Sequence, residues 1–289
     1  MRPVAAGGRR IWGLAGLAVI ASLAIPGGWL IATAGDSAYS RVPQQTVTQV
    51  ITVPEPVTTL NVDSNGTPVQ ITAGPVQRVR VSEAITYDLK HGLPTAVKQS
   101  VSGGILTLDG VCQVPDCAVG FIVTVPPGVA VAADTEGGAL TVSGVAAATL
   151  DSGGGPVRAT GISGHLIVTT ADGSLVVNGL AGPLDADTGG GQVLAAGIDA
   201  TTATILTGGG EAQIGFTAPP DGLFVSTDGG PATLTVPGGP YALTASTYDG
   251  SEAIGIATDP AAGRSITVTT GGGPLRIEPP NDRTAPAGP

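Results

Sequence analysis

The sequence predicts an all-β fold, a single-chain β-solenoid, and two observations carry that prediction. The first is a short pattern that recurs eight times. Each copy is anchored on a Thr or Ser just before a glycine cluster: Thr135, Ser152, Thr170, Thr188, Thr207, Thr227, Thr247 and Thr270. Successive anchors are 17 to 23 residues apart. Self-similarity at about this period is typical of a solenoid, in which each repeat buries its apolar face against its neighbours.

The second observation is an apolar register inside the repeat. The positions four and two residues before each anchor, and five and seven after it, are apolar in 31 of 32 cases, the exception being Glu252. Apolar residues two apart are typical of a strand whose alternate side chains face one core. The glycines supply the positive φ angles that a tight turn needs. Each repeat is therefore predicted to be a strand, a glycine turn and a second strand, in about 9–10 rungs of 17–23 residues.

The N-terminus predicts a membrane segment. Three arginines precede residues 11–35, which carry no charge and would span a membrane as a helix. The positive-inside rule then places residues 1–10 in the cytoplasm and the rest outside. Pro26 interrupts the apolar run, and Ala32-Thr33-Ala34 fits a signal-peptidase site. The segment is thus either a transmembrane anchor or a signal cleaved after Ala34, and both readings export the repeats.

The remaining boundaries follow from composition. Residues 36–56, rich in Thr, Gln, Val and Pro, predict a linker, and residues 279–289 predict a disordered Pro-rich tail. The solenoid is predicted over residues 57–278, beginning with a copy anchored on Ser64. A weaker copy is expected at residues 97–108, within a less regular stretch. Phe121–Gly128 predicts a strand ending in a Pro-Pro-Gly turn.

Two details of the repeat leave alternatives open. The return loop lengthens from Gly144–Ala147 to Ala257–Ser265, which indicates either a variable binding face or simple tolerance of loop drift. An apolar residue follows a glycine in four early repeats, which suggests a short third side to those rungs: Val145, Ile162, Leu180 and Ile198. Whether a rung has two or three sides is therefore open.

Charge and cysteine content narrow the function classes. All 22 acidic residues follow residue 35, and the net charge is −10, so a nucleic-acid partner is not expected. The two cysteines, Cys112 and Cys117, have no second pair to complete a structural zinc site. In an oxidising compartment they are predicted to form a disulfide, with free thiols as the alternative.

No catalytic, cofactor-binding or metal-binding residue is predicted. His165 falls one position before a core slot, where a solvent-facing spacer is expected rather than a catalytic base. Carboxylates recur beside the glycine turns: Asp134, Glu136, Asp151, Asp172, Asp187, Asp228 and Asp249. Stacked rungs would bring some of them about 5 Å apart. Loose calcium binding would use such a ladder, but the ordinary preference of Asp for turns also explains it.

The run FIVTVPPGVAVAADTEGGALTVSG and the glycine-turn units after it resemble a bacterial envelope family described as "putative adhesins" with a β-strand repeat. The resemblance covers about residues 57–278. It implies a right-handed, β-helix-like solenoid outside the membrane, with no established catalytic residues. Some members resemble partners of envelope-stress systems.

Together these observations predict a non-catalytic, membrane-anchored, extracytoplasmic module that binds or scaffolds at the bacterial cell envelope. Its expected partner is a cell-wall polymer or an envelope protein, with no cofactor. One alternative is an accessory or sensory subunit of an envelope-stress system. A second is a carbohydrate-active enzyme using the turn carboxylates.

Overall fold

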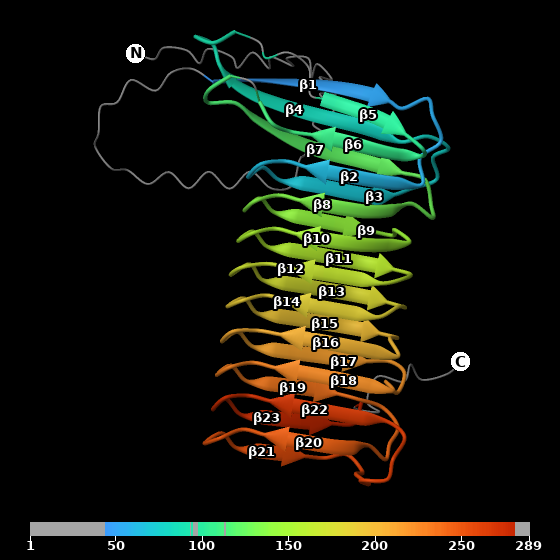
Figure 1. The fold of residues 1–289 in the computed structure, drawn as a ribbon, viewed down its shortest axis with the longest axis vertical. Helices are drawn as coiled ribbons and strands as arrows, with labels where there is room; N and C mark the ends of the chain where they lie inside the picture. Colours follow the sequence, from blue (N-terminus) through green and yellow to red (C-terminus); the bar gives the residue numbers. More distant parts are fainter. Residues whose placement is uncertain (1–43, 93, 95–97, 113, 281–289) are drawn as a thin grey trace, which may run out of the picture. The chain divides into compact units, whose positions relative to one another are not determined.

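A computed structural model describes residues 44–92, 94, 98–112 and 114–280. These residues form two β-sheets, sheet A with 12 strands and sheet B with 11, and they contain no helix (Figure 1). The all-β prediction is confirmed for this part of the chain. None of the described residues forms a helix suited to crossing a membrane. The predicted segment at 11–35 lies outside them, as do most of the predicted tail and the N-terminal residues.

The chain builds ten rungs within the described residues, each pairing one strand of sheet B with the next strand of sheet A. The first five in chain order are β2 (Thr59–Asp63) with β3 (Val69–Ala73), β6 (Ile105–Asp109) with β7 (Ala118–Val125), β8 (Ala130–Asp134) with β9 (Leu140–Ser143), β10 (Ala147–Asp151) with β11 (Val157–Ile162), and β12 (Leu166–Thr169) with β13 (Leu175–Leu180). The other five are β14 (Leu184–Asp187) with β15 (Val193–Ile198), β16 (Thr202–Leu206) with β17 (Ala212–Phe216), β18 (Gly222–Ser226) with β19 (Ala232–Thr235), β20 (Ala242–Ser246) with β21 (Glu252–Ile254), and β22 (Ser265–Thr269) with β23 (Leu275–Glu278). Neighbouring rungs pair in parallel, as a solenoid requires.

Rung order in space departs from chain order at both ends of the stack. The β2–β3 rung lies between β6–β7 and β8–β9, and the β22–β23 rung lies between β18–β19 and β20–β21. The loop that joins β19 to β20 therefore crosses two rung spacings toward the C-terminal end of the stack. The loop that joins β21 to β22 returns by one spacing. Each spacing is about 4.8 Å. The lengthened return loops of the sequence thus lie where the rung order changes.

Three further strands close the N-terminal end of the stack. The strand β4 (Arg80–Asp88) pairs antiparallel with β7, and β1 (Gln44–Thr52) pairs antiparallel with β4. The prediction of a linker over 36–56 is therefore wrong for residues 44–52, which form an edge strand of sheet A. That stretch lacks the apolar register of the repeat because its side chains lie at the end of the core, where most are exposed.

The prediction of a weaker repeat at residues 97–108 is also wrong. The strand β5 (Lys98–Ser102) pairs antiparallel with β6, joined by Gly103 and Gly104 at positive φ. Those glycines make a hairpin within sheet B instead of a turn between the two sheets. The predicted strand at 121–128 is confirmed by β7, which Pro126, Pro127 and Gly128 end.

The core lies between the sheets and follows the predicted register. Every apolar slot outside the β20–β21 rung is buried, and so are the four slots around Ser64: Leu60, Val62, Val69 and Ile71. The exceptions form the end of the stack, where Leu243 and Ala245 are half-buried and Ile254 is 37% exposed. Glu252, the one polar slot, is exposed in the same rung. A carboxylate is tolerated there because no further rung covers it.

The anchor residues form a buried ladder of hydroxyl groups. All eight anchors and Ser64 are buried, and each donates a side-chain hydrogen bond to the carbonyl oxygen three residues later. Thr188 Oγ1, for example, donates to the Gly191 carbonyl at 2.6 Å. The Gly191 amide donates back to the Thr188 carbonyl at 2.8 Å, which closes the turn. The repeat therefore conserves a hydroxyl because the turn needs a buried donor.

Most of the turns keep a glycine three residues after the anchor for steric reasons. A Cβ at Gly155, Gly173, Gly191 or Gly210 would collide with the carbonyl of the equivalent glycine in the neighbouring rung. Their φ angles are not positive, so conformational freedom is not what selects glycine there. Positive φ occurs at other turn positions, where Glu136 (φ 47°) adopts it without being glycine. Close approach of successive rungs sets this glycine.

The sheet pairing accounts for three of the four residues that suggested a third side. Ile162, Leu180 and Ile198 are buried, but they are the last residues of β11, β13 and β15 and pair with one another within sheet A. Each follows a glycine at positive φ, which bends the strand and turns the next side chain back toward the core. The fourth, Val145, is also buried but lies outside the strands.

Candidate binding surface

Four aspartates lie side by side on the outer face of sheet B. The β-sheet register places Asp63 opposite Asp109 on one side and Asp134 on the other, and Asp134 opposite Asp151. In space the order is Asp109, Asp63, Asp134, Asp151, and we call these four residues the Asp ladder. Neighbouring strands are about 4.8 Å apart, so the ladder is a row of closely spaced carboxylates. None of the four forms a salt bridge with a described residue.

Local turn chemistry places these side chains. Each member directly precedes a turn, and in three of them one carboxylate oxygen accepts a backbone N–H two residues on. Asp109 accepts from Val111 at 2.9 Å, Asp134 from Glu136 at 3.0 Å, and Asp151 from Gly153 at 3.0 Å. This is the ordinary preference of Asp for turns. The other carboxylate oxygen of each residue makes no hydrogen bond that the described residues supply.

A shallow hollow of about 270 Å³ adjoins the ladder. It is lined by residues of four strands: Asn61, Val62, Asp63, Thr107, Ala132, Ala133, Asp134, Thr149 and Asp151. Thr107, Asn61, Ala132 and Thr149 lie in one row across β6, β2, β8 and β10. Ala132 is the smallest of them and leaves the depression. The surface of the hollow is almost entirely apolar, and the carboxylates of the Asp ladder lie along its edge.

The structure brings together some of the predicted turn carboxylates and separates others. Asp134 and Asp151 are direct neighbours, whereas Thr169 separates Asp151 from Asp187. Asp63 and Asp109 belong to the row but were not among the predicted residues. The signal for Asp63 was its place immediately before Ser64, which matches that of Asp134 before Thr135. Its position next to Asp134 depends on the rung order, which the sequence does not reveal.

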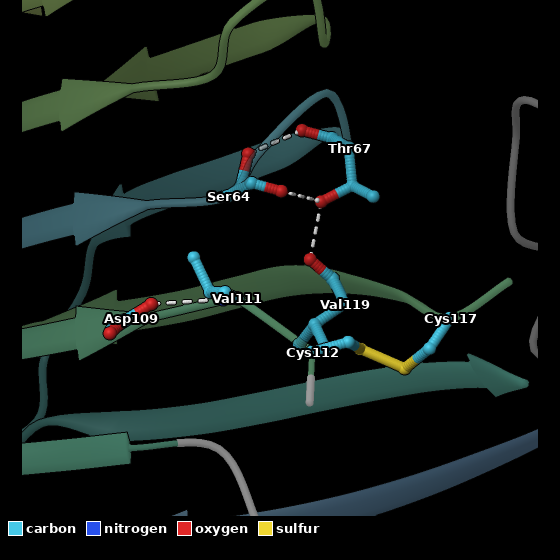
Figure 2. Close-up of a disulfide and its surroundings, with 7 residues drawn as sticks. All are labelled: Ser64, Thr67, Asp109, Val111, Cys112, Cys117 and Val119. Atoms are coloured by element: carbon cyan, nitrogen blue, oxygen red, sulfur yellow. Dashed lines mark hydrogen bonds between the residues drawn. A yellow bond between two sulfur atoms is a disulfide. The ribbon is translucent and has the colours of Figure 1, made fainter. Parts of the chain in front are cut away.

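The predicted disulfide is present and replaces a glycine turn. Cys112 and Cys117 are bonded in the loop that joins β6 to β7, where other rungs have the anchor and its glycines (Figure 2). The turn of the neighbouring rung contacts the start of β7, just after this loop, because Thr67 Oγ1 donates to the Val119 carbonyl (Figure 2). Ser64 and Thr67 also exchange hydrogen bonds of 2.7 and 2.8 Å. The disulfide therefore holds a turn that lacks the buried hydroxyl.

His165 lies where the sequence predicted. Its side chain is 44% exposed, and its Nε2 lies 2.7 Å from Asp185 Oδ2, also on the outer face. An exposed pair of this kind contributes little to stability. The prediction of a solvent-facing residue is confirmed.

Comparisons with known proteins give fold neighbours and no family assignment. No protein-family model matches the chain, and no curated protein matches it. Among solved structures, a "putative adhesin" from Bacteroides fragilis is 13% identical, covers 82% of this chain and 97% of its own, and has a TM-score of 0.47. A "putative adhesin" from Parabacteroides distasonis is 12% identical with the same coverages and a TM-score of 0.36. A "putative cell adhesion protein" from Clostridium sporogenes is 11% identical, covers 82% of this chain and 100% of its own, and has a TM-score of 0.24. The functional proposal below rests on the chain's own residues.

Proposed function

We propose that the chain is a non-catalytic, adhesin-like module of the bacterial cell envelope that binds a hydroxyl-rich polymer on the outer face of sheet B. The single observation that carries the proposal is the Asp ladder beside the hollow at Asn61, Thr107 and Thr149. Membrane anchoring, export and the cell-wall partner remain predictions from the sequence.

The chemistry of the Asp ladder supports a glycan over other ligands. Carboxylates with an unused oxygen accept hydrogen bonds from sugar hydroxyls, and charge-assisted hydrogen bonds are the stronger ones. An anionic polymer such as nucleic acid would be repelled by a row of like charges. A flat, repeating surface also matches a polymer better than a small molecule, because adjacent rungs present similar groups about 4.8 Å apart.

Binding of the full chain, purified in detergent, to purified cell-wall fractions tests the proposal. The informative variant is Asp63→Asn with Asp134→Asn, which removes two charges and keeps an acceptor oxygen for the turn at Asp134. The matched control is Asp172→Asn with Asp249→Asn, which removes the same charge from exposed turn residues outside the ladder. We expect saturable binding by the unmodified chain, at least about tenfold weaker binding by the ladder variant, and no change in the control.

Other outcomes would contradict the proposal. Equal losses in both variants would mean that overall negative charge, and not the ladder, determines binding. No saturable binding to any glycan fraction would remove the polymer-binding reading. Capture of a membrane protein in place of a polymer would favour the accessory or sensory alternative.

A further inference from the structure

We infer that Asp88, His91 and Asp116 form a Zn²⁺ site that joins the turn after β4 to the disulfide loop before β7. One ligand atom of each residue lies within 4.8 Å of the others. In the part of the chain that the structure describes, this is the one group of three or more metal-ligating side chains so placed. It lies apart from the hollow beside the Asp ladder and goes beyond the proposed binding function.

Strand register explains why these residues meet. The antiparallel strands β4 and β7 end their pairing at Thr86 opposite Ala118. Asp88 and Asp116 each lie two residues beyond this last pair, Asp88 as the final residue of β4 and Asp116 in the turn before β7. His91 follows in the turn after β4, where its amide donates to the Asp88 carbonyl at 3.0 Å. The disulfide holds the other side, since Asp116 immediately precedes Cys117.

The charges of this arrangement call for a cation. Two carboxylates held this close to each other repel when both are ionised. Asp88 is only 5% exposed, and burial makes an unpaired carboxylate costly. The described residues offer neither aspartate a salt bridge, although Asp88 Oδ1 accepts the Lys90 amide at 2.8 Å. A divalent cation between Asp88 and Asp116 would turn their repulsion into attraction, with neutral His91 as the third donor.

The donor set selects the metal. Zn²⁺ takes imidazole nitrogen and carboxylate oxygen at about 2.0–2.2 Å in tetrahedral sites, and three protein ligands leave one position for water. Ca²⁺ favours six to eight oxygen ligands and is a poor match for imidazole. His91 and Asp116 are exposed, so their side chains have room to rotate onto a common ion while Asp88 stays fixed.

The test is calorimetric titration of the full chain, stripped with a chelator, with Zn²⁺ alone. The chain has only two histidines, which makes His165→Ala a matched control for His91→Ala. We expect one Zn²⁺ per chain, unchanged in the control and bound at least about tenfold more weakly by His91→Ala. Added Zn²⁺ should also raise the thermal midpoint of the unmodified chain and of His165→Ala, but not of His91→Ala.

A second variant keeps the test independent of folding. Asp116→Asn removes a charge from an exposed turn residue without changing its size, and we expect it to weaken Zn²⁺ binding as His91→Ala does. Unchanged affinity in either of these two variants would overturn the site. So would loss of binding in His165→Ala, absence of saturable Zn²⁺ binding to the unmodified chain, or tighter binding of Ca²⁺ than of Zn²⁺.

Discussion

The two ends of the stack use the same order of rungs but finish differently. At each end, the rung that comes first or last in the sequence lies one place inside the end, with another rung beyond it. At the N-terminal end the outer rung, β6–β7, is covered by the antiparallel strands β4, β1 and β5. At the C-terminal end no described strand covers the outer rung, β20–β21.

This difference shows how little of a rung's stability resides in the rung itself. The β20–β21 rung has the same anchor, Thr247, and the same hydrogen bond to the carbonyl of Gly250 as the internal rungs. Its core slots are nonetheless half-buried or exposed, because they have a neighbour on one side only. In a solenoid, burial is a property of neighbouring pairs, so position in the stack decides what a substitution costs.

The largest expected difference in stability is between an Ile→Asp substitution in the middle of the stack and the same substitution in the uncovered outer rung. Ile205→Asp places a carboxylate at a site with no exposure, which costs about 3–5 kcal/mol. Ile254→Asp makes the same change at a core slot of the outer rung, on sheet A, that is 37% exposed, so the carboxylate reaches water. Thermal unfolding followed by circular dichroism should show a large loss for Ile205→Asp and a small one for Ile254→Asp. Equal losses would mean that the outer rung is covered.

The next contrast lies within one turn. Gly210→Ala drives a methyl group into the backbone of Gly191 in the neighbouring rung, an overpacking that costs about 1–3 kcal/mol. Gly209→Ala adds the same methyl group where no atom lies within 4 Å, and we expect a change within about 0.5 kcal/mol. Chemical denaturation of the two variants measures the difference. Similar values for both would show that turn conformation, not the approach of rungs, selects glycine.

The third prediction concerns the covered end. Replacing Cys112 and Cys117 by serine removes a cross-link over five residues, which contributes about 2 kcal/mol by the loop-entropy relation. Hydrogen exchange should accelerate in β6 and β7 and stay unchanged in β20–β23. Faster exchange throughout the stack would instead indicate that the ends unfold together with the middle.

The smallest effect is a pH dependence in the strands that cover the N-terminal end. Glu83 on β4 is fully buried, and this burial raises its pKa above the usual 4.5, although a hydrogen bond from Gln49 at 2.7 Å opposes the shift. Its other oxygen, Oε1, is buried without a partner. Because the folded-state pKa is raised, the protonated form is favoured on folding, and stability falls as the pH rises from about 4.5 through the folded value.

Glu83→Gln removes this penalty. We expect the variant to melt at a higher temperature than the unmodified chain near pH 7, and the advantage to vanish near pH 4, where the carboxyl group is protonated in both states. Melting curves across that range provide the measurement. A constant difference at every pH would mean that ionisation of Glu83 is not its cause.

The sequence predicts the interior of the stack far better than its ends. The slots around Thr188 or Thr207 repeat because each rung meets an almost identical neighbour, so local pattern and tertiary contact agree. At the ends this agreement fails. The sequence of Gln44–Thr52 predicts a linker, because its partner strand β4 is remote in the sequence and does not carry the repeat pattern. Gly103 and Gly104 resemble the glycines of a rung turn in sequence, but they form a hairpin between β5 and β6.

The candidate site shows the same division. The turn positions of Asp134 and Asp151 are readable from the repeat, and so is their adjacency. The sequence does not reveal that Asp63 is adjacent to Asp134. Five strands, β3 to β7, separate the two residues in the sequence, and β8 then pairs with β2 on the side away from β6. Residues 71 apart in the sequence become neighbours through a crossing that no local signal marks.

The placement of β22 and β23 sets a condition on how the molecule is completed. A chain is made from its N-terminus, so β20 and β21 exist before the rung that finally separates them from β18 and β19. Until residues 265–278 are made, the β20–β21 rung lacks the neighbour with which it pairs in the final structure, and the β18–β19 rung has an unpaired edge. A chain that stops short of Ser265 therefore lacks an interior piece, not merely its last turn. The last described rung in chain order is thus the one that completes the packing of both of its neighbours.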